Sequence, residues 1–526
     1  MAAFVTVLVA AILPSACAYR AEREAPPGWG ITLVTREVPL GRLPEDVHPD
    51  EGIVSISPDG EHVICVARRD EKRIVYVDGT EGKQFDGIGS PGEMEGQDPW
   101  DILFRVSEHF TRVAYVAVRG EKRLVVLDGV EGREYDGIHN IVFSPDSKRL
   151  GYIAERERFV PEEISGVPFG LGESKFLAVV DGLEGKEYDG VREFVFSPDS
   201  SRVAYVAKEG EHEFLVLDGQ EGERHPEIWN LCFSPDSKRV AYVVGDRFAW
   251  FMPESHEKTD QFVVVDGVPG NTYQCIPFPT FSVSSVGTFA GNFAPWRSPL
   301  LFSPDSRHIA YLARSEGKEL LVVDGLELEV RRTKDTGAAD DLRVEVVFSP
   351  DSAHMAYTAQ REEKWCVIVN GAQGDLCDRV GDIVFSPDSA HMAYIAQREK
   401  KWCVVADGVQ GDLYECVSNI VFSPDSARLA YIGTRDGKEF VVLGEEEGKA
   451  YDWVGLPLFG PGGAQHIAYP ARRGQRWVLV VDGFESREFE GAHCPFLANF
   501  DGPASLHAVV IRNRQVVRVE VQIVNP

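Results

Sequence analysis

Positive charge, long apolar runs and the motifs of metal or nucleotide sites are all scarce in this sequence. Its 526 residues include 54 Lys and Arg against 83 Asp and Glu, which gives a formal net charge of −29. Such a chain repels phosphate, so nucleic acid and anionic membrane surfaces are excluded as its main partners. Apolar residues still make up 44% of the chain, enough for a packed core rather than a disordered polymer.

Apolar runs are short everywhere, and the one at the N-terminus is of a particular kind. Ala2–Leu13 is an apolar run of 12 residues, whereas a membrane-spanning helix needs about 20. Small residues follow, so we predict a signal peptide over residues 1–18 and an exported protein, periplasmic or extracellular. Lipidation of Cys17 is an alternative route, which would tether the chain. No Lys or Arg precedes Arg20, so an apolar N-terminal strand stays open as another interpretation.

The sequence motifs of common enzyme and metal sites are absent. There is no Cys-x-x-Cys pair, no Cys/His cluster with zinc spacing, no G-x-S-x-G, no glycine-rich phosphate loop and no H-E-x-x-H. We therefore expect no metal, no cofactor and a non-catalytic protein. Because an active site built from scattered loops leaves no motif, a hydrolase or lyase at a central channel mouth is the alternative.

The nine cysteines include two pairs at equivalent positions. Cys366 and Cys377 flank one turn, and Cys403 and Cys416 flank the next equivalent turn. In an exported protein each pair could form a disulfide across its hairpin. The alternative is that these are four small buried side chains.

What the sequence has in abundance is one short phrase. Ser-Pro-Asp-Gly begins at Ser57, and Ser-Pro-Asp-Ser begins at Ser144, Ser197, Ser234, Ser303, Ser349, Ser386 and Ser423. The prolines Pro350, Pro387 and Pro424 are spaced by 37 residues. Less regular copies raise the total to about eleven units, and a fixed period of this size is typical of solenoids and propellers.

One unit illustrates the expected blade. Asn419–Phe422 predicts strand a, the Ser-Pro-Asp-Ser turn follows, and Arg428–Gly433 predicts strand b. Glu439–Leu443 predicts strand c and Lys449–Tyr451 strand d. In most units the c–d turn contains Asp-Gly, a strong hairpin signal. We therefore predict an all-β protein, a β-propeller of about eleven four-stranded antiparallel blades of about 37 residues.

The recurring segments resemble a known family. Val142–Ala154 (VFSPDSKRLGYIA) and Val421–Gly433 (VFSPDSARLAYIG) are similar to the WD-40-like propeller repeat of the TolB type, and the resemblance covers nearly all of the chain after residue 50. It implies the propeller fold. TolB carries an α/β domain before its propeller, but only about 30 residues separate the expected signal peptide from the first unit. The resemblance therefore implies no Tol–Pal role.

Eleven blades exceed the four to eight of ordinary propellers, which favours two rings. We predict one part over residues 31–275, with about five blades, and another over 276–526, with about six. The last unit provides strands a to c, with Val516–Ile523 as c, but no strand d. Ile31–Val38 is a spare strand before the first unit and could complete that last blade.

Extra residues collect in the b–c and d–a connections, which emerge together on one face of a blade. Arg156–Ser174 and Gly245–Gln261 are b–c insertions, and Ile276–Ser298 is a d–a insertion. Loops on a rigid scaffold commonly bind ligands, and rigid aromatic residues are typical anchors. Candidate binding residues in the last two insertions are Phe248, Trp250, Phe251, Phe281, Phe293 and Trp296.

These observations favour a protein- or peptide-binding module whose acidic surface suits a basic partner. The aromatic residues could instead pack beneath their own loops or seal a contact between rings, and a purely structural scaffold is a further possibility. The Ser-Pro-Asp aspartates recur once per blade and so do not converge on one point. We interpret them as turn formers rather than metal ligands.

Overall fold

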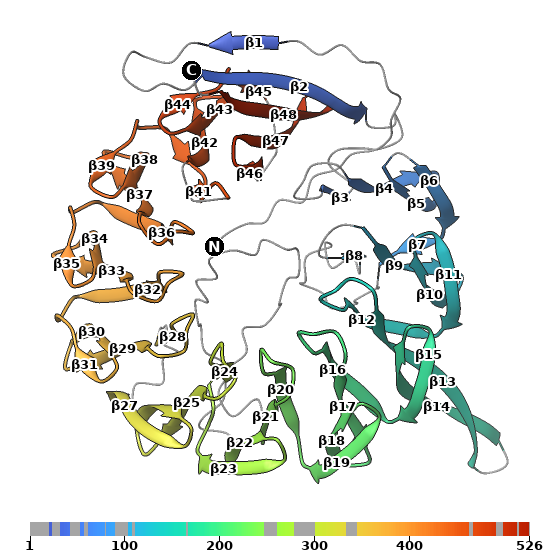
Figure 1. Ribbon diagram of the computed structural model, residues 1–526. Coiled ribbons are helices and arrows are strands. Elements are labelled where there is room, and N and C mark those ends of the chain that lie inside the picture. The colour runs from blue at the N-terminus through green and yellow to red at the C-terminus, as the bar shows by residue number, and fades with distance from the viewer. Residues whose placement is uncertain are drawn as a thin grey trace. The chain divides into compact units, whose positions relative to one another are not determined.

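The computed structural model describes residues 20–23, 32–42, 53–56, 62–78, 80–89, 104–107, 111–164, 167–246, 260–277, 300–332, 344–461, 466–490, 498–512 and 515–524. These residues form strands and turns (Figure 1), and none of them belongs to a helix that could cross a membrane. The predicted signal peptide and Cys17 lie outside the described residues.

The described strands form eleven antiparallel sheets, most of them four-stranded and built from consecutive strands, as in propeller blades. The chain divides into two compact units. The first contains Met1–Gln84, Ser282–Phe289 and Glu345–Pro526, and the second contains Phe85–Phe281 and Ala290–Val344. The expected division between residues 275 and 276 falls inside the second unit. The predicted division separates two propeller rings, whereas these units are defined by compactness. The predicted division therefore stays a prediction.

Five sheets belong to the second unit. In chain order they are formed by β7 (Gly87–Ile88), β8 (Phe104–Val106), β9 (Val113–Arg119), β10 (Lys122–Leu127) and β11 (Val130–Tyr135); β12 (Gly137–Phe143), β13 (Leu150–Ile164), β14 (Val167–Val180) and β15 (Leu183–Tyr188); β16 (Gly190–Phe196), β17 (Val203–Glu209), β18 (His212–Leu217) and β19 (Gln220–His225); β20 (Ile228–Phe233), β21 (Val240–Val244), β22 (Gln261–Val265) and β23 (Val268–Tyr273); and β24 (Leu300–Phe302), β25 (Ile309–Ser315), β26 (Lys318–Val323) and β27 (Leu326–Arg332).

Six sheets belong to the first unit, apart from Phe85 at the end of one strand. They are formed by β3 (Ile53–Ile56), β4 (Val63–Arg69), β5 (Lys72–Val77) and β6 (Thr80–Phe85); β28 (Val346–Phe348), β29 (Met355–Arg361), β30 (Lys364–Val369) and β31 (Ala372–Gln373); β32 (Arg379–Phe385), β33 (Met392–Arg398), β34 (Lys401–Ala406) and β35 (Val409–Gln410); β36 (Cys416–Phe422), β37 (Leu429–Arg435), β38 (Lys438–Leu443) and β39 (Glu446–Glu447); β40 (Trp453–Val454), β41 (Leu458–Phe459), β42 (Ile467–Arg473), β43 (Arg476–Val481), β44 (Phe484–Glu485) and β45 (Phe489–Glu490); and β46 (Ala498–Gly502), β47 (Ser505–Arg512), β48 (Gln515–Val524), β2 (Thr32–Arg42) and β1 (Arg20–Arg23).

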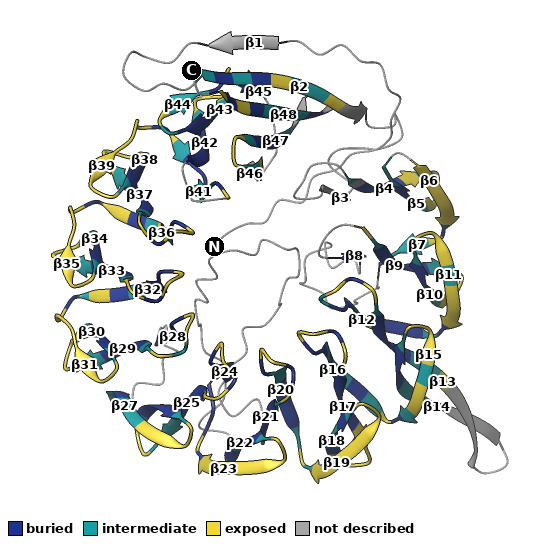
Figure 2. Cartoon of the chain, viewed as in Figure 1, coloured by how far each residue is buried: buried dark blue, intermediate teal, exposed yellow. Residues whose placement is uncertain are grey.

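The strands of a sheet differ in burial because neighbouring sheets cover both faces of its middle strands. In β9 the five residues of VAYVA are all buried, and the equivalent β17 has the same pattern. Such strands read as continuous apolar runs rather than as alternating ones. The outer strands β11 and β19 are polar and largely exposed, which blunts the open sheet edge (Figure 2).

Two predicted turns take the expected local form. The Asp128-Gly129 turn joins β10 to β11 with both φ angles positive, 50° and 79°, as a type I′ hairpin turn requires. In the Ser-Pro-Asp-Ser turn of Ser144–Ser147, the backbone N–H of Ser147 donates to the Ser144 carbonyl over 2.8 Å. The last Ser has a φ of 62°. Both turns hold their strands in register.

The two ends of the described chain share one sheet, as the sequence predicted. β2 pairs with β48 in antiparallel register, with Leu33 opposite Ile523. β2 thus supplies the fourth strand that the last sequence repeat lacks. β1 adds a fifth strand beyond β2. This closure confirms the expectation that the spare N-terminal strand completes the last blade.

One insertion expected as a loop is instead an extension of a hairpin. β13 and β14 remain paired from Gly151 opposite Val180 to Ile164 opposite Val167. The b–c insertion therefore continues both strands well beyond the length found in β17 and β18. Sequence analysis missed this because the inserted residues do not alternate in polarity.

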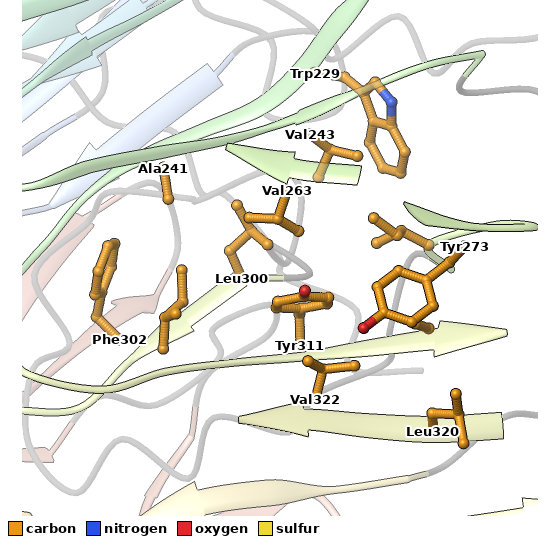
Figure 3. Close-up of a cluster of buried hydrophobic side chains, with 13 residues drawn as sticks. Trp229, Ala241, Val243, Val263, Tyr273, Leu300, Phe302, Tyr311, Leu320 and Val322 are labelled. Atoms are coloured by element: carbon orange, nitrogen blue, oxygen red, sulfur yellow. The ribbon is translucent and has the colours of Figure 1, made fainter. Parts of the chain in front are cut away.

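The core lies between neighbouring sheets, where their faces pack together. Figure 3 shows one such layer, between β20–β23 and β24–β27, in which Trp229 and Val243 approach Tyr311 and Tyr273. The indole Nε1 of Trp229 donates to the Gly245 carbonyl over 2.9 Å, so its polar atom is satisfied in the core. Equivalent clusters fill other junctions within each unit.

Candidate binding site between two neighbouring sheets

The Ser-Pro-Asp-Ser turn is a structural device, as predicted. The Ser144 hydroxyl donates to Asp146 Oδ1 over 2.7 Å and accepts the backbone N–H of Arg149 over 2.9 Å. Asp146 Oδ1 also accepts the backbone N–H of Lys148 over 3.1 Å. These hydrogen bonds, the hydroxyl first, lower the pKa of Asp146 to about 2. The aspartate is therefore a turn former.

The last Ser of five of these turns also connects neighbouring sheets. The backbone N–H of Asp146 donates over 2.9 Å to the hydroxyl of Ser200, which belongs to the turn of the next sheet. Since Ser200 is almost fully buried, this bond fixes one turn against the next. Equivalent bonds run from Asp199 to Ser237, Asp236 to Ser306, Asp351 to Ser389 and Asp388 to Ser426.

In the second unit an arginine adds a further bond between sheets. Arg149 Nε donates to Asp181 of its own sheet over 2.9 Å. Its Nη1 crosses to the next sheet and donates to the carbonyls of Ser200 and Ser201 over 3.1 and 3.2 Å. The guanidinium carbon lies 5.2 Å from the ring centroid of Phe196. Arg112, Arg202 and Arg239 make equivalent contacts at their own junctions.

The junction between β28–β31 and β32–β35 has a histidine where those sheets have the arginine. Asn370 replaces the usual turn aspartate, and its Nδ2 donates to His354 Nδ1 over 2.7 Å. The imidazole thus hydrogen-bonds within its own sheet. Imidazole is shorter than a guanidinium side chain, and a hollow of about 410 Å³ lies where the sheets meet.

We call this space the turn-end hollow, because a–b and c–d turns surround it. Its lining includes His354, Phe385, Ser389, Ala390, His391 and Asp407. His391 Nδ1 donates to Asp407 Oδ2 over 2.7 Å, and this bond raises the pKa of His391. The side chains of His391 and Asp407 are 48% and 52% exposed, so the hollow has a rim open to solvent.

A second hollow lies at the other end of the same junction, among b–c and d–a connections. This loop-end hollow has a volume of about 570 Å³ and a charged lining. Lys364 is paired with Asp378, and Arg398 Nη2 donates to Asp375 over 2.9 Å. These ion pairs occupy Lys364, Asp378 and Arg398, three of the charged groups that line the loop-end hollow.

The structure does not form the predicted disulfides. Cys366, Cys377, Cys403 and Cys416 are all free. Cys377 lies opposite Trp365, so its side chain points to the sheet face opposite that of Cys366. Cys403 is in β34, whereas Cys416 already begins β36 of the next sheet. Burial raises the pKa of Cys366, Cys377 and Cys403, which are small core side chains.

The candidate aromatic residues lie outside the described residues. These are Phe248, Trp250, Phe251, Phe281, Phe293 and Trp296. The loop face that they would form stays a prediction.

The turn-end hollow lies at the opposite end of the blades. Sequence analysis missed it because a histidine that recurs at one repeat position, as His354 and His391 do, is normally structural. The available signal was a histidine in place of arginine at the fifth residue after the first Ser of the turn. His354 follows Ser349 by five residues, as Arg149 follows Ser144.

Two glutamates at the innermost strands bond backbone groups of the neighbouring sheet. Glu193 Oε2 accepts the backbone N–H of Leu231 over 2.8 Å, and Glu345 Oε1 accepts that of Ile383 over 3.1 Å. Both glutamates therefore satisfy backbone groups of the next sheet, which is a structural role.

The closing sheet contains a charged cluster that sequence analysis also missed. His507 Nδ1 donates to Asp501 over 2.7 Å, and Arg518 Nη2 donates to the same carboxylate oxygen over 3.0 Å. His507 is buried, and the cluster borders a hollow of about 700 Å³. The last sequence repeat lacks the Ser-Pro-Asp-Ser phrase, so alignment of the repeats gave no indication of these residues.

No protein-family model and no curated protein matches this chain. Similar solved structures include a crystal structure of the eukaryotic initiation factor, with 13% identity, a TM-score of 0.34 and coverage of 76% of this chain and 97% of that chain. The β-propeller domain of the Trilobed protease from Pyrococcus furiosus has 12% identity, a TM-score of 0.26 and coverage of 59% and 95%. TolB from Acinetobacter baumannii has 11% identity, a TM-score of 0.21 and coverage of 71% and 81%. These similarities assign no function.

Proposed function

We propose that this chain is an exported, non-catalytic β-propeller of the TolB-like type that binds a protein or peptide. The observation that carries the proposal is the turn-end hollow, which lies at a position where other junctions hold an arginine side chain. Its lining combines an aromatic ring, imidazoles and a carboxylate at a solvent-exposed rim. This mixture suits a side chain presented by a partner.

Charge and the N-terminal sequence support the rest of the proposal. The net charge of −29 favours a basic partner through long-range attraction. The apolar run at Ala2–Leu13 favours export, with Cys17 as a possible lipid anchor. The long b–c and d–a insertions are a second proposed binding surface on the other face.

Selection of random peptides displayed on phage against the full chain tests this function. We expect enrichment of a sequence motif whose synthetic peptide binds in solution, measured by fluorescence anisotropy. His354→Arg should weaken binding if the peptide uses the turn-end hollow, and deletion of residues 279–298 should weaken it if the loop face is used. The deletion spares Ile276, which is fully buried. Val130→Ser, at an exposed site of the second unit, is the control. Failure to enrich any motif would contradict the proposal.

A hydrolase or lyase is the second candidate function, favoured by the His507, Asp501 and Arg518 cluster. A histidine held by a carboxylate is a common acid–base pair. Turnover of a panel of chromogenic esters and glycosides by the wild type, abolished in His507→Asn, would support an enzyme. Equal turnover by both proteins would exclude this cluster as its active site.

A further inference from the structure

The arginine junctions of the second unit show what surrounds a guanidinium between two sheets. The ring of Phe196 lies on one side of the Arg149 guanidinium, at 5.2 Å. Two carbonyls of the next turn, those of Ser200 and Ser201, accept its N–H groups. The turn aspartate accepts from Nε. A ring, a pair of carbonyls and a side-chain oxygen thus make up the site.

The turn-end hollow is bordered by the same elements, but its own sheet provides no guanidinium. Phe385 occupies the ring position, and Ser389 and Ala390 occupy the positions of the two residues whose carbonyls accept. Asn370 stands in place of the aspartate, and its Oδ1 accepts the Met355 backbone N–H over 3.0 Å, as the aspartate does elsewhere. Two groups thus differ from an arginine junction: His354 replaces the arginine and Asn370 replaces the aspartate.

We propose that the turn-end hollow binds the guanidinium of an arginine side chain on a protein or peptide partner. This inference rests on the proposed function and names the group that the partner presents. The bound guanidinium stacks on Phe385 and donates to the carbonyls of Ser389 and Ala390. Asp407 lies at the rim of the same hollow, where it accepts a hydrogen bond from His391.

The geometry favours guanidinium over ammonium. A guanidinium is planar and weakly hydrated, and it donates several N–H groups in fixed directions, so it can stack on a ring and bond two carbonyls at once. A lysine ammonium is a compact, strongly hydrated point charge. Within the first unit, Arg428 lies over Phe459 at 5.1 Å, which shows that the blades there accept the same stacking.

Peptides that differ only at one residue test the proposal. We expect acetyl-Gly-Gly-Arg-Gly-Gly-amide to bind the full chain at least about tenfold more tightly than its lysine counterpart, measured by titration calorimetry. Ethylguanidinium should compete for the same site more weakly than the peptide. Equal affinities for the two peptides would overturn the proposal. Ethylguanidinium binding as tightly as the peptide would overturn the assignment to a partner chain.

Substitutions at His354 provide the matched variants. His354→Arg fills the hollow from within, and we expect it to raise the Tm and to weaken binding of the arginine peptide at least about tenfold. His354→Gln keeps the hollow open and should keep the affinity. Unchanged affinity in His354→Arg would place the peptide elsewhere and overturn the site, even if other peptides still bind and the proposed function stands.

The reverse experiment opens an arginine junction. Arg202→Ala leaves Phe233 and the acceptor carbonyls without their guanidinium. Millimolar ethylguanidinium should raise the Tm of this variant more than that of the wild type, whereas ethylammonium should not. If neither cation raises the Tm, the blade surroundings do not bind a free guanidinium, and the proposal fails.

Discussion

Two sheet junctions among the described residues differ at one repeat position. At Arg149 the side chain reaches the next sheet and stacks on its phenylalanine. At His354 the side chain bonds Asn370 of its own sheet, and a hollow borders the next one. The Ser-to-Asp backbone bond is present at both junctions. A repeat can therefore keep its scaffold contact while a hollow takes the place of a second contact.

The largest expected effect separates the two kinds of junction directly. Arg202→Ala should lower the free energy of unfolding by about 1–2 kcal/mol, because charge-assisted hydrogen bonds are lost from a partly exposed site. The Arg202 side chain is 29% exposed and Asp218 is 43% exposed. His354→Ala should cost clearly less, since its bond stays within one sheet. Thermal unfolding of both variants measures this, and equal losses would contradict the distinction.

A smaller effect should be the same at both junctions. Ser200→Ala and Ser389→Ala each remove the hydroxyl that accepts the backbone N–H of an aspartate in the preceding sheet. Each should destabilise by about 1 kcal/mol, as for a buried hydrogen bond. The measurement is the Tm of each variant beside the wild type. A much larger loss at Ser389 would mean that the histidine junction depends more on this bond than the arginine junction does.

The smallest effect depends on pH and concerns His391, which lines the turn-end hollow. The hydrogen bond to Asp407 raises the pKa of His391, so protonated His391 is favoured in the folded state. Its contribution is complete below the unfolded pKa of about 6.5 and is lost as pH rises through the raised pKa. The Tm difference between wild type and Asp407→Asn should therefore shrink from pH 5 to pH 9. The substituted Asn still accepts from Met392, as Asn370 does from Met355. A constant difference would show that the pair does not titrate in this range.

Much of the fold was predictable because its signals are local. The Ser144–Ser147 turn and the Asp128-Gly129 hairpin are fixed by backbone preferences of the residues themselves. The apolar run of β9 marks a strand covered on both faces. The spare strand β2 was identified by counting strands, and its pairing with β48 followed.

The candidate site was less predictable because its signals are not local. The disulfide prediction failed at Cys366 and Cys377, where the exact register of a short outer strand decides which face a side chain takes. The turn-end hollow depends on how far one side chain extends toward the next sheet, and histidine at a repeat position looks structural from sequence alone. The charged cluster at His507 joins residues of three strands. These strands belong to a repeat without the Ser-Pro-Asp-Ser phrase.

By itself, the sequence determined the all-β class, the repeating blade and the closing strand, because turn chemistry and apolar periodicity act over a few residues. Only the tertiary structure decided which junction between sheets is filled and which is hollow. The physical reason is that a guanidinium and an imidazole satisfy the same turn but reach different distances. The groups that the longer arginine side chain contacts belong to the neighbouring sheet, so they depend on how the sheets pack.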